Sequence, residues 1–212
     1  MKPYYQDELV TLYNADCLEH ADIWLEGGDV MVTDPPYGMA YQSGHTKTRK
    51  HKRIAGDETT EARDKVLSLW GDKPAIVFGR WNQPRPDKIV HRLIWSKAPD
   101  PGMGNLKMPW GNSDEEIYIL GAGWIGKRSA NVLTYPTLPA NNRPNHPTPK
   151  PVPLMEDLIR KCPPGVIIDP FVGSGATLRA AKNLGRVAIG FEIDSDYCEV
   201  AAQMLGQEVL FS

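Results

Sequence analysis

The residue types that most directly suggest chemistry lie in one tetrapeptide, which is Asp34, Pro35, Pro36 and Tyr37. The Asp34 carboxylate and the Pro35 carbonyl are two hydrogen-bond acceptors, and the proline pair stiffens the backbone without adding a competing N–H group. Two such acceptors can hold an exocyclic amino group, and the Tyr37 ring can stack on the same base. The tetrapeptide follows the apolar run 30–33, which predicts a strand, and open α/β sheets place their chemistry where strands end.

A second segment has the residue types of a ligand-binding turn. The apolar run 166–168 leads into Asp169-Pro170-Phe171-Val172-Gly173-Ser174-Gly175-Ala176-Thr177, and a helical pattern follows. The glycines allow a sharp turn and a close approach of backbone to ligand, and Glu192 at the end of the next apolar run can accept both hydroxyls of a ribose. This unit suits an adenosine-containing ligand. The sequence lacks the Gly-Lys-Ser/Thr of a P-loop and the third glycine of the dinucleotide fingerprint, which counts against NAD.

The elements that must position these residues alternate along the chain. Strands are predicted at 9–13, 30–33, 75–78, 92–95, 116–120, 166–168 and 187–193. Helices are predicted at 61–70, 152–162, 176–184 and 197–205. Asp196 is the expected N-cap of the last helix, with Glu199 completing a capping box. The alternation predicts an α/β fold with a mostly parallel sheet and helices on both faces.

Two stretches interrupt this alternation. Residues 41–56 form a basic loop that carries Lys47, Arg49, Lys50, Lys52 and Arg53. These side chains either contact nucleic-acid phosphates or form a solvated charged surface. Residues 136–153 contain seven prolines and are expected to be an extended connector between two blocks of one sheet.

Length and composition limit the alternatives. The 212 residues suit a single domain spanning 1–212, and 24 basic against 26 acidic residues, a net charge of −2, exclude a wholly basic nucleic-acid binder such as a histone. Three widely spaced cysteines form neither a disulfide framework nor a zinc site, and no histidines have ligand spacing, so no metal is expected. Without a long apolar run or leading signal segment, the chain is expected in the cytoplasm of a bacterial or phage-infected cell, with no membrane partner.

Taken together, three motifs resemble a known family. The tetrapeptide at 34–37, the segment His146-Pro147-Thr148-Pro149-Lys150-Pro151 and the glycine segment at 169–175, in that order, resemble the amino-group DNA methyltransferases that use S-adenosylmethionine. The order, with the catalytic motif first, is similar to that of the circularly permuted β class. The resemblance runs from about Leu12 to about Leu205 and implies a Rossmann-like methyltransferase fold.

The resemblance also implies roles for individual residues. The catalytic set would be Asp34, Pro35, Pro36 and Tyr37. The cofactor-binding set would be Asp16, Cys17, Thr148, Lys150, Asp169, Phe171, Gly173, Gly175, Thr177, Glu192 and Ile193. In this assignment Ile193 lies against the adenine ring, while Thr148 and Lys150 close over the cofactor's amino-acid end. Ala15 replaces the glycine that usually precedes the acid at position 16, so Asp16 is alternatively an ordinary turn acid, and Lys150 is alternatively a solvated linker charge.

The implied reaction is methyl transfer to the exocyclic amine of a base extruded from duplex DNA. An Asp at position 34 favours adenine N6, with cytosine N4 as the alternative. DNA-facing insertions are expected at 41–56 and 102–145, and Arg80 is expected near the base. The absence of a separate recognition domain suggests a short site, relaxed specificity or a second subunit in a homodimer. The rival interpretations are an RNA or protein-glutamine methyltransferase and a catalytically inactive DNA-binding relative.

Overall fold

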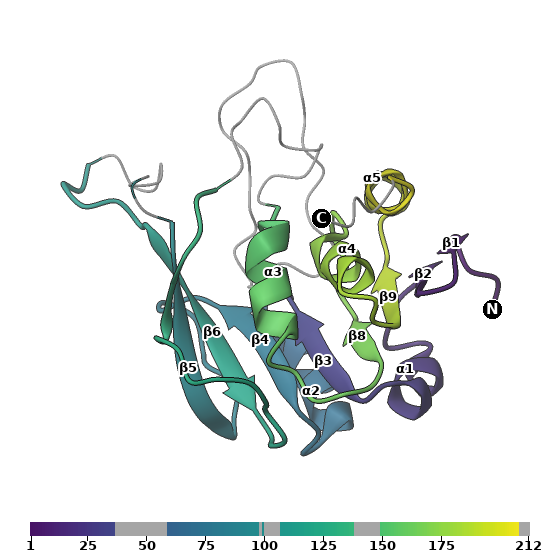
Figure 1. Cartoon of the computed structure of the whole chain (residues 1–212), viewed down its shortest axis with the longest axis horizontal. Helices are drawn as coiled ribbons and strands as arrows, with labels where there is room; N and C mark the ends of the chain where they lie inside the picture. The colour runs from purple at the N-terminus through teal and green to yellow at the C-terminus, as the bar shows by residue number, and fades with distance from the viewer. Residues whose placement is uncertain (37–58, 98, 100–106, 138–148, 208–212) are drawn as a thin grey trace.

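The computed structural model describes residues 1–36, 59–97, 99, 107–137 and 149–207 of the chain. Within these residues nine strands form one sheet in the order β1-β2-β9-β8-β3-β4-β6-β5-β7 (Figure 1). The strands are β1 (Tyr5–Gln6), β2 (Val10–Asn14), β3 (Val30–Thr33), β4 (Ala75–Gly79), β5 (Ile89–Ser96), β6 (Asp114–Leu120), β7 (Val132–Thr134), β8 (Ile167–Asp169) and β9 (Ala188–Glu192). The helices are α1 (Ala21–Gly27), α2 (Glu61–Trp70), α3 (Val152–Ile159), α4 (Ala176–Asn183) and α5 (Ser195–Leu205).

The central strands run parallel, so their carboxyl ends share one edge of the sheet. Strands β2, β9, β8, β3 and β4 pair in parallel, in that order. Strand β6 runs antiparallel to both β4 and β5, so it begins at the edge where those two strands end. The mostly parallel sheet of the predicted methyltransferase fold is therefore confirmed.

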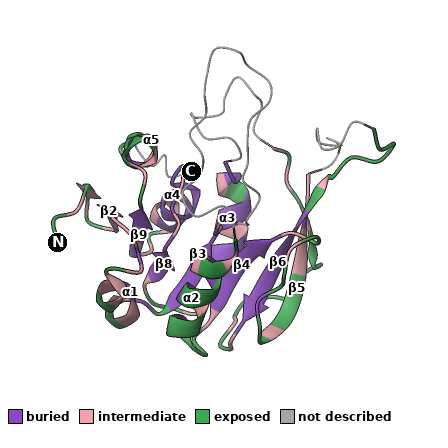
Figure 2. Ribbon diagram, turned by 180° about the vertical axis from the view of Figure 1, so that it is seen from behind, coloured by how far each residue is buried: buried purple, intermediate pink, exposed green. Residues whose placement is uncertain are grey.

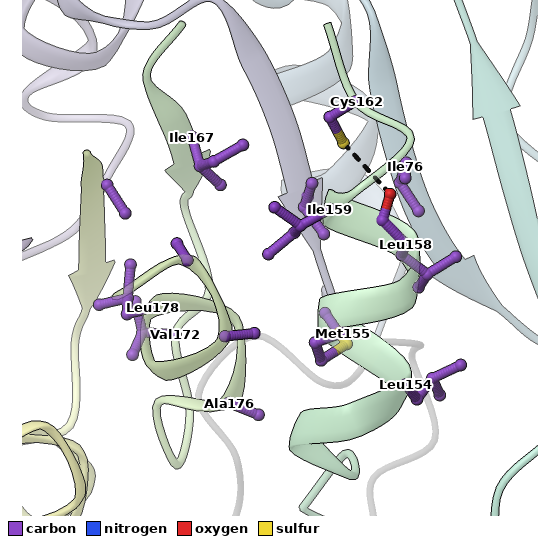
Figure 3. Packing of buried hydrophobic residues seen from close by; sticks show 14 of the residues in the cluster. Ile76, Leu154, Met155, Leu158, Ile159, Cys162, Ile167, Val172, Ala176 and Leu178 are labelled. Carbon is purple, nitrogen blue, oxygen red and sulfur yellow. Dashed lines mark hydrogen bonds between the residues drawn. The ribbon is translucent and has the colours of Figure 1, made fainter. Parts of the chain in front are cut away.

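Helices cover both faces of the sheet, because alternate residues of each buried strand point to opposite sides. Helices α3, α4 and α5 pack on one face, where Leu154, Met155 and Leu158 of α3 lie beside Ala176 and Leu178 of α4 (Figure 3). Helices α1 and α2 pack on the other face (Figure 2). There the Trp24 and Trp70 ring centres lie 5.9 Å apart.

The predicted bounds of most helices and strands agree with the structure within a few residues, but three short elements were not predicted. The strand 30–33 and the helix 61–70 have the predicted bounds. Strands β1 and β7 contain two and three residues, and α1 contains seven, which is too short for a clear periodic signal. Strand β6 and strand β7 both lie inside the predicted DNA-facing insertion 102–145, so that segment contributes to the sheet.

The predicted capping box at the last helix was wrong. Helix α5 begins at Ser195, and its N-cap is Asp194, whose carboxylate accepts a hydrogen bond from the Asp196 N–H at 2.9 Å. Glu199 instead accepts a hydrogen bond from the Tyr4 hydroxyl at 2.9 Å. Asp194, two residues after the end of β9, therefore caps the helix, and Tyr4 of the N-terminal segment contacts α5.

Within the described ranges, no helix combines the length and the apolar character needed to cross a membrane.

Candidate active site

The two motifs meet at the carboxyl edge of the sheet. Strands β3 and β8 pair directly, with Val30 opposite Ile167. At the end of β3 the Thr33 hydroxyl donates a hydrogen bond to the Asp169 carboxylate over 2.7 Å, although 136 positions separate the two residues in sequence. Asp34 follows Thr33 directly, so the start of the tetrapeptide lies beside the start of the glycine segment.

The glycine segment forms a tight bend that leads into α4. Gly173 and Gly175 have φ values of 53° and 93°, in the left-handed region that favours glycine. A Cβ added at Gly175 would lie 3.0 Å from the Ala201 Cβ of α5, so this position also requires a close approach of backbone to helix. The Val172 N–H donates to the Phe191 carbonyl at 3.0 Å, which ties the bend to β9.

Glu192 ends β9 and faces this bend. One carboxylate oxygen accepts from the Gly173 N–H at 2.8 Å and the other accepts from the Asp194 N–H at 2.9 Å. Burial raises the pKa of Glu192, and the two backbone donors only partly offset that effect. A buried carboxylate that carries one donor on each oxygen keeps further lone pairs, so it fits the two hydroxyls of a ribose.

Residues at the end of β2 lie beside Glu192. The Asn14 side-chain amide donates to the main-chain carbonyls of Glu192 and Ile193 at 2.9 and 3.1 Å. The Asp16 carboxylate accepts from the Leu18 N–H at 2.8 Å, which shapes the turn. The Ile193 side chain is half exposed, so it can pack on a flat ligand.

Cys17 is placed differently from the other residues assigned to the cofactor. Its thiol is buried in the core under α1, and burial raises its pKa to about 12. Its carbonyl accepts a hydrogen bond from the Trp24 indole at 2.8 Å. Cys17 therefore stabilises the turn after β2 through core packing and a main-chain hydrogen bond.

Asp169 and Thr177 form a buried clasp. The Asp169 carboxylate accepts from Thr33, from the Phe171 N–H at 3.1 Å and from the Thr177 hydroxyl. Burial raises the pKa of Asp169 to about 6, and these neutral donors offset only part of that effect. The side chains of Asp169 and Thr177 hold the bend in shape and join it to β3.

Directly after β3, Asp34 is part of a chain of ion pairs. Its side chain is about one quarter exposed at 23%, Pro35 is buried, and Tyr37 lies outside the described residues. The Lys150 ammonium contacts the Asp34 carboxylate and also lies 3.2 Å from one oxygen of Glu115. The other Glu115 oxygen is 2.6 Å from the Lys97 ammonium. Lys150 is thus buried against Asp34 rather than exposed in a solvated linker.

Aromatic rings enclose these charges. The Lys150 ammonium lies 5.0 Å from the centre of the Phe78 ring and 5.8 Å from that of Trp95. Lys97 lies 4.9 Å from the centre of the Trp95 ring. Burial alone would raise the pKa of Glu115, but Lys150 and Lys97 outweigh it and lower that pKa.

Sequence reasoning missed Glu115 and Lys97. The predicted strand 116–120 began at Glu116 and left out Asp114 and Glu115. In the structure β6 begins at Asp114, and both glutamates are buried. Three consecutive acids leading into an apolar strand are the available signal, because acids entering a sheet need partners.

The predicted DNA contacts are only partly described. Arg80 follows β4 at the same edge and is partly buried, and its carbonyl accepts from the Gln83 N–H at 3.1 Å. The Trp81 side chain beside it is 67% exposed. Thr148 lies outside the described residues. So do the basic residues of segment 41–56, which are Lys47, Arg49, Lys50, Lys52 and Arg53. Among the residues that are described, no three His, Cys, Asp or Glu side chains group as a metal site would require.

Known proteins share this fold. The structure matches a complex of M1.HpyAVI with S-adenosylmethionine at a TM-score of 0.68 and 20% identity, over 94% of this chain and 100% of that one. It matches the cytosine-N4-specific PvuII DNA methyltransferase at a TM-score of 0.67 and 17% identity, over 100% of this chain and 91% of that one.

Sequence comparison is more specific. The type II methyltransferase M2.DpnII of Streptococcus pneumoniae is 43% identical over 98% of this chain and 93% of its own length. M.ScaI of Streptomyces caespitosus is 27% identical over 98% of this chain and 84% of its own length. A family model for N6 and N4 methyltransferases, described as DNA methylase, matches residues 41–203. The chain therefore belongs to the amino-group DNA methyltransferases, a family that depends on S-adenosylmethionine.

Proposed function

We propose that this chain methylates the N6 amino group of adenine in DNA, with Asp34 and Pro35 as the acceptors for that amine. The observation that carries the proposal is the hydrogen bond from Thr33 to Asp169, because it seats the acceptor motif next to the cofactor bend. The methylated amine must lie within reach of both motifs, and reacting groups must be held about 3–3.5 Å apart before transfer.

The bend and its neighbours fit S-adenosylmethionine. Glu192 is the acceptor for the ribose hydroxyls, Ile193 packs on the adenine ring, and Asp16 faces the adenine amino group. Phe171, Gly173 and Gly175 form the bend around the ligand, with Thr148 over its amino-acid end. When bound, the cofactor supplies an electrophilic methyl group, and the electron pair of the broken C–S bond stays on sulfur.

The acceptors of the tetrapeptide activate the amine. The nitrogen of an arylamine is a poor nucleophile because its lone pair is shared with the ring. When Asp34 and the Pro35 carbonyl accept its two hydrogens, that lone pair is localised on nitrogen as the new N–C bond forms. Asp34 then accepts the surplus proton, and no covalent enzyme intermediate is needed.

The target amine in duplex DNA is inside the base stack, so the base must be extruded. Tyr37 stacks on the extruded base, and Arg80 is next to it at the sheet edge. The basic loop 41–56 supplies phosphate contacts, which explains how a chain of net charge −2 binds DNA. The proposed place of action is DNA in the bacterial cytoplasm.

Cytosine N4 is the second candidate, because its amine suits the same two acceptors. The experiment incubates the purified protein with S-adenosylmethionine and genomic DNA from a host without methylases, and then identifies modified nucleosides by mass spectrometry. We expect N6-methyladenine. N4-methylcytosine alone would refute the assignment of the base, and no modified nucleoside would refute the activity.

A further inference from the structure

Glu115 is a buried acid in the catalytic half of the site that none of the proposed roles uses. Its side chain is 5% exposed, and it lies at the start of β6, where β3, β4 and β5 end. A buried carboxylate costs several kcal/mol unless it is paired. Lys97 and Lys150 supply that pairing, at 2.6 and 3.2 Å.

Lys150 connects this acid to Asp34. Its side chain is 5% exposed and lies against the Phe78 and Trp95 rings, so it has lost most of its hydration. Burial lowers the pKa of Lys150, but the charges of Asp34 and Glu115 outweigh that effect and raise it. The two carboxylates together therefore favour the charged form of this lysine despite its burial.

We propose that Glu115 is a positioning residue that holds the charged Lys150 in its aromatic cage, so that Lys150 orients Asp34 as an ionised acceptor for the target amine. This inference rests on the proposed function of Asp34. A carboxylate has about four lone-pair sites, so the contact with Lys150 leaves Asp34 able to accept an amino hydrogen. Lys97 balances the second carboxylate, and the four groups together carry no net charge.

The inference has a pH signature. Among the described residues, ion pairs join Lys150 to Asp34, directly after β3, and to Glu115 on β6. Beyond Glu115 lies Lys97, directly after β5, while Asp169 faces Asp34 from β8. Glu115→Gln removes one of the two charges that raise the pKa of Lys150. The lysine then loses its proton at a lower pH, so the alkaline limb of the activity profile moves to lower pH.

Glu116 offers a matched control on the same strand. It is also buried and paired, with Arg85 at 2.8 Å and Arg92 at 2.7 Å, but it faces the opposite side of the sheet. Glu116→Gln thus removes an equally buried acid from β6 without touching Lys150. Glu115→Asp is the conservative variant, because it keeps the charge that Lys150 needs.

The experiment compares kcat, KM for DNA, calorimetric affinity for S-adenosylmethionine and the pH profile in these variants. For Glu115→Gln we expect a roughly 100-fold loss of kcat, the size that a misplaced catalytic group produces, with cofactor affinity unchanged and the alkaline limb shifted down. Glu116→Gln should retain kcat and the position of that limb, and Glu115→Asp should recover part of the kcat. Equal kcat and equal pH profiles in Glu115→Gln and Glu116→Gln would overturn the inference.

A second measurement needs no turnover. The Lys150 side chain is followed by NMR during a pH titration, with Lys150→Arg used to assign its signal. In the wild type we expect a pKa above the ordinary 10.5, and a lower value in Glu115→Gln. An unchanged Lys150 pKa in Glu115→Gln would overturn the inference even if that variant were inactive. A wild-type protein that methylates no DNA would refute the proposed function separately.

Discussion

Asp169 and Glu192, on the proposed cofactor side of the sheet edge, accept hydrogen bonds from neutral donors, whereas Asp34 and Glu115, on the proposed catalytic side, face lysines. Burial dominates on the first side and raises the pKa of both acids. On the second side, the lysines outweigh burial and lower the pKa of Glu115.

The difference between neutral donors and ion pairs suits two separate tasks at the carboxyl edge of the sheet. Neutral backbone donors fix the shape of the bend, and they leave carboxylate lone pairs for hydroxyl groups of a ligand. On the proposed catalytic side, lysines favour the charged form of Glu115 despite its burial, and Lys150 also contacts Asp34, which suits an acceptor of amino hydrogens. The contrast predicts that substitutions on the two sides change different measurements.

The largest effect is expected at Asp34. Asp34→Ala removes the proposed acceptor of the amine, so kcat should fall by roughly 10²- to 10⁴-fold, the range typical of a proton-transfer group. Affinity for S-adenosylmethionine, measured by calorimetry, should be retained because the bend is intact. Turnover like that of the wild type would reject the catalytic role.

The raised pKa of Asp169 predicts a pH-dependent stability. Between its ordinary 3.8 and about 6, the folded protein binds more protons at this site than the unfolded chain, so its contribution to stability falls as pH rises through that window. The fall amounts to roughly 3 kcal/mol at most and levels off above the folded pKa.

Asp169→Asn removes this titration. The difference in free energy of unfolding between wild type and variant, measured by urea denaturation from pH 4 to 7, should change in favour of the variant as pH rises. A constant difference across that range would mean that Asp169 titrates normally.

Substitution of Glu192 should mainly change the affinity for S-adenosylmethionine. Glu192→Gln replaces a charged acceptor, and a hydrogen bond to a charged group contributes about 1.5–3 kcal/mol, so the dissociation constant of S-adenosylmethionine should rise by roughly 10- to 100-fold. Glu199→Gln, on exposed α5 surface, is the control and should bind normally. Unchanged affinity in Glu192→Gln would remove Glu192 from the cofactor site.

The smallest effect is expected at the link between the two sides. Thr33→Val removes the hydrogen bond to Asp169 and should cost about 1 kcal/mol of unfolding free energy, together with some kcat. Thr134→Val, on the exposed edge strand β7, is the control in the same urea titration. If both variants lost the same stability and activity, the link would not couple the two motifs.

The grouping of residues on the proposed cofactor side was predictable because these residues lie close together in sequence or end neighbouring strands. Asp169 ends β8, Phe171, Gly173 and Gly175 follow in the bend, and Glu192 ends β9, so strand-turn-helix geometry alone brings them together. The elements missed there are α1 and β1, which are short and lack a clear period. The charged cluster around Asp34 was less predictable, since Glu115 and Lys97 belong to no recognisable sequence motif.

The amino-acid sequence by itself determined the two motifs, their order and the parallel sheet, because glycines, prolines and apolar periods act on backbone geometry over a few residues. Only the tertiary structure decided the partners of Asp34. Lys150 lies 116 positions away in sequence, and it meets Asp34 and Glu115 only because β3, β5 and β6 end or begin at the same edge. A buried charge needs an opposite charge nearby, and long-range packing rather than local propensity determines which residue supplies it.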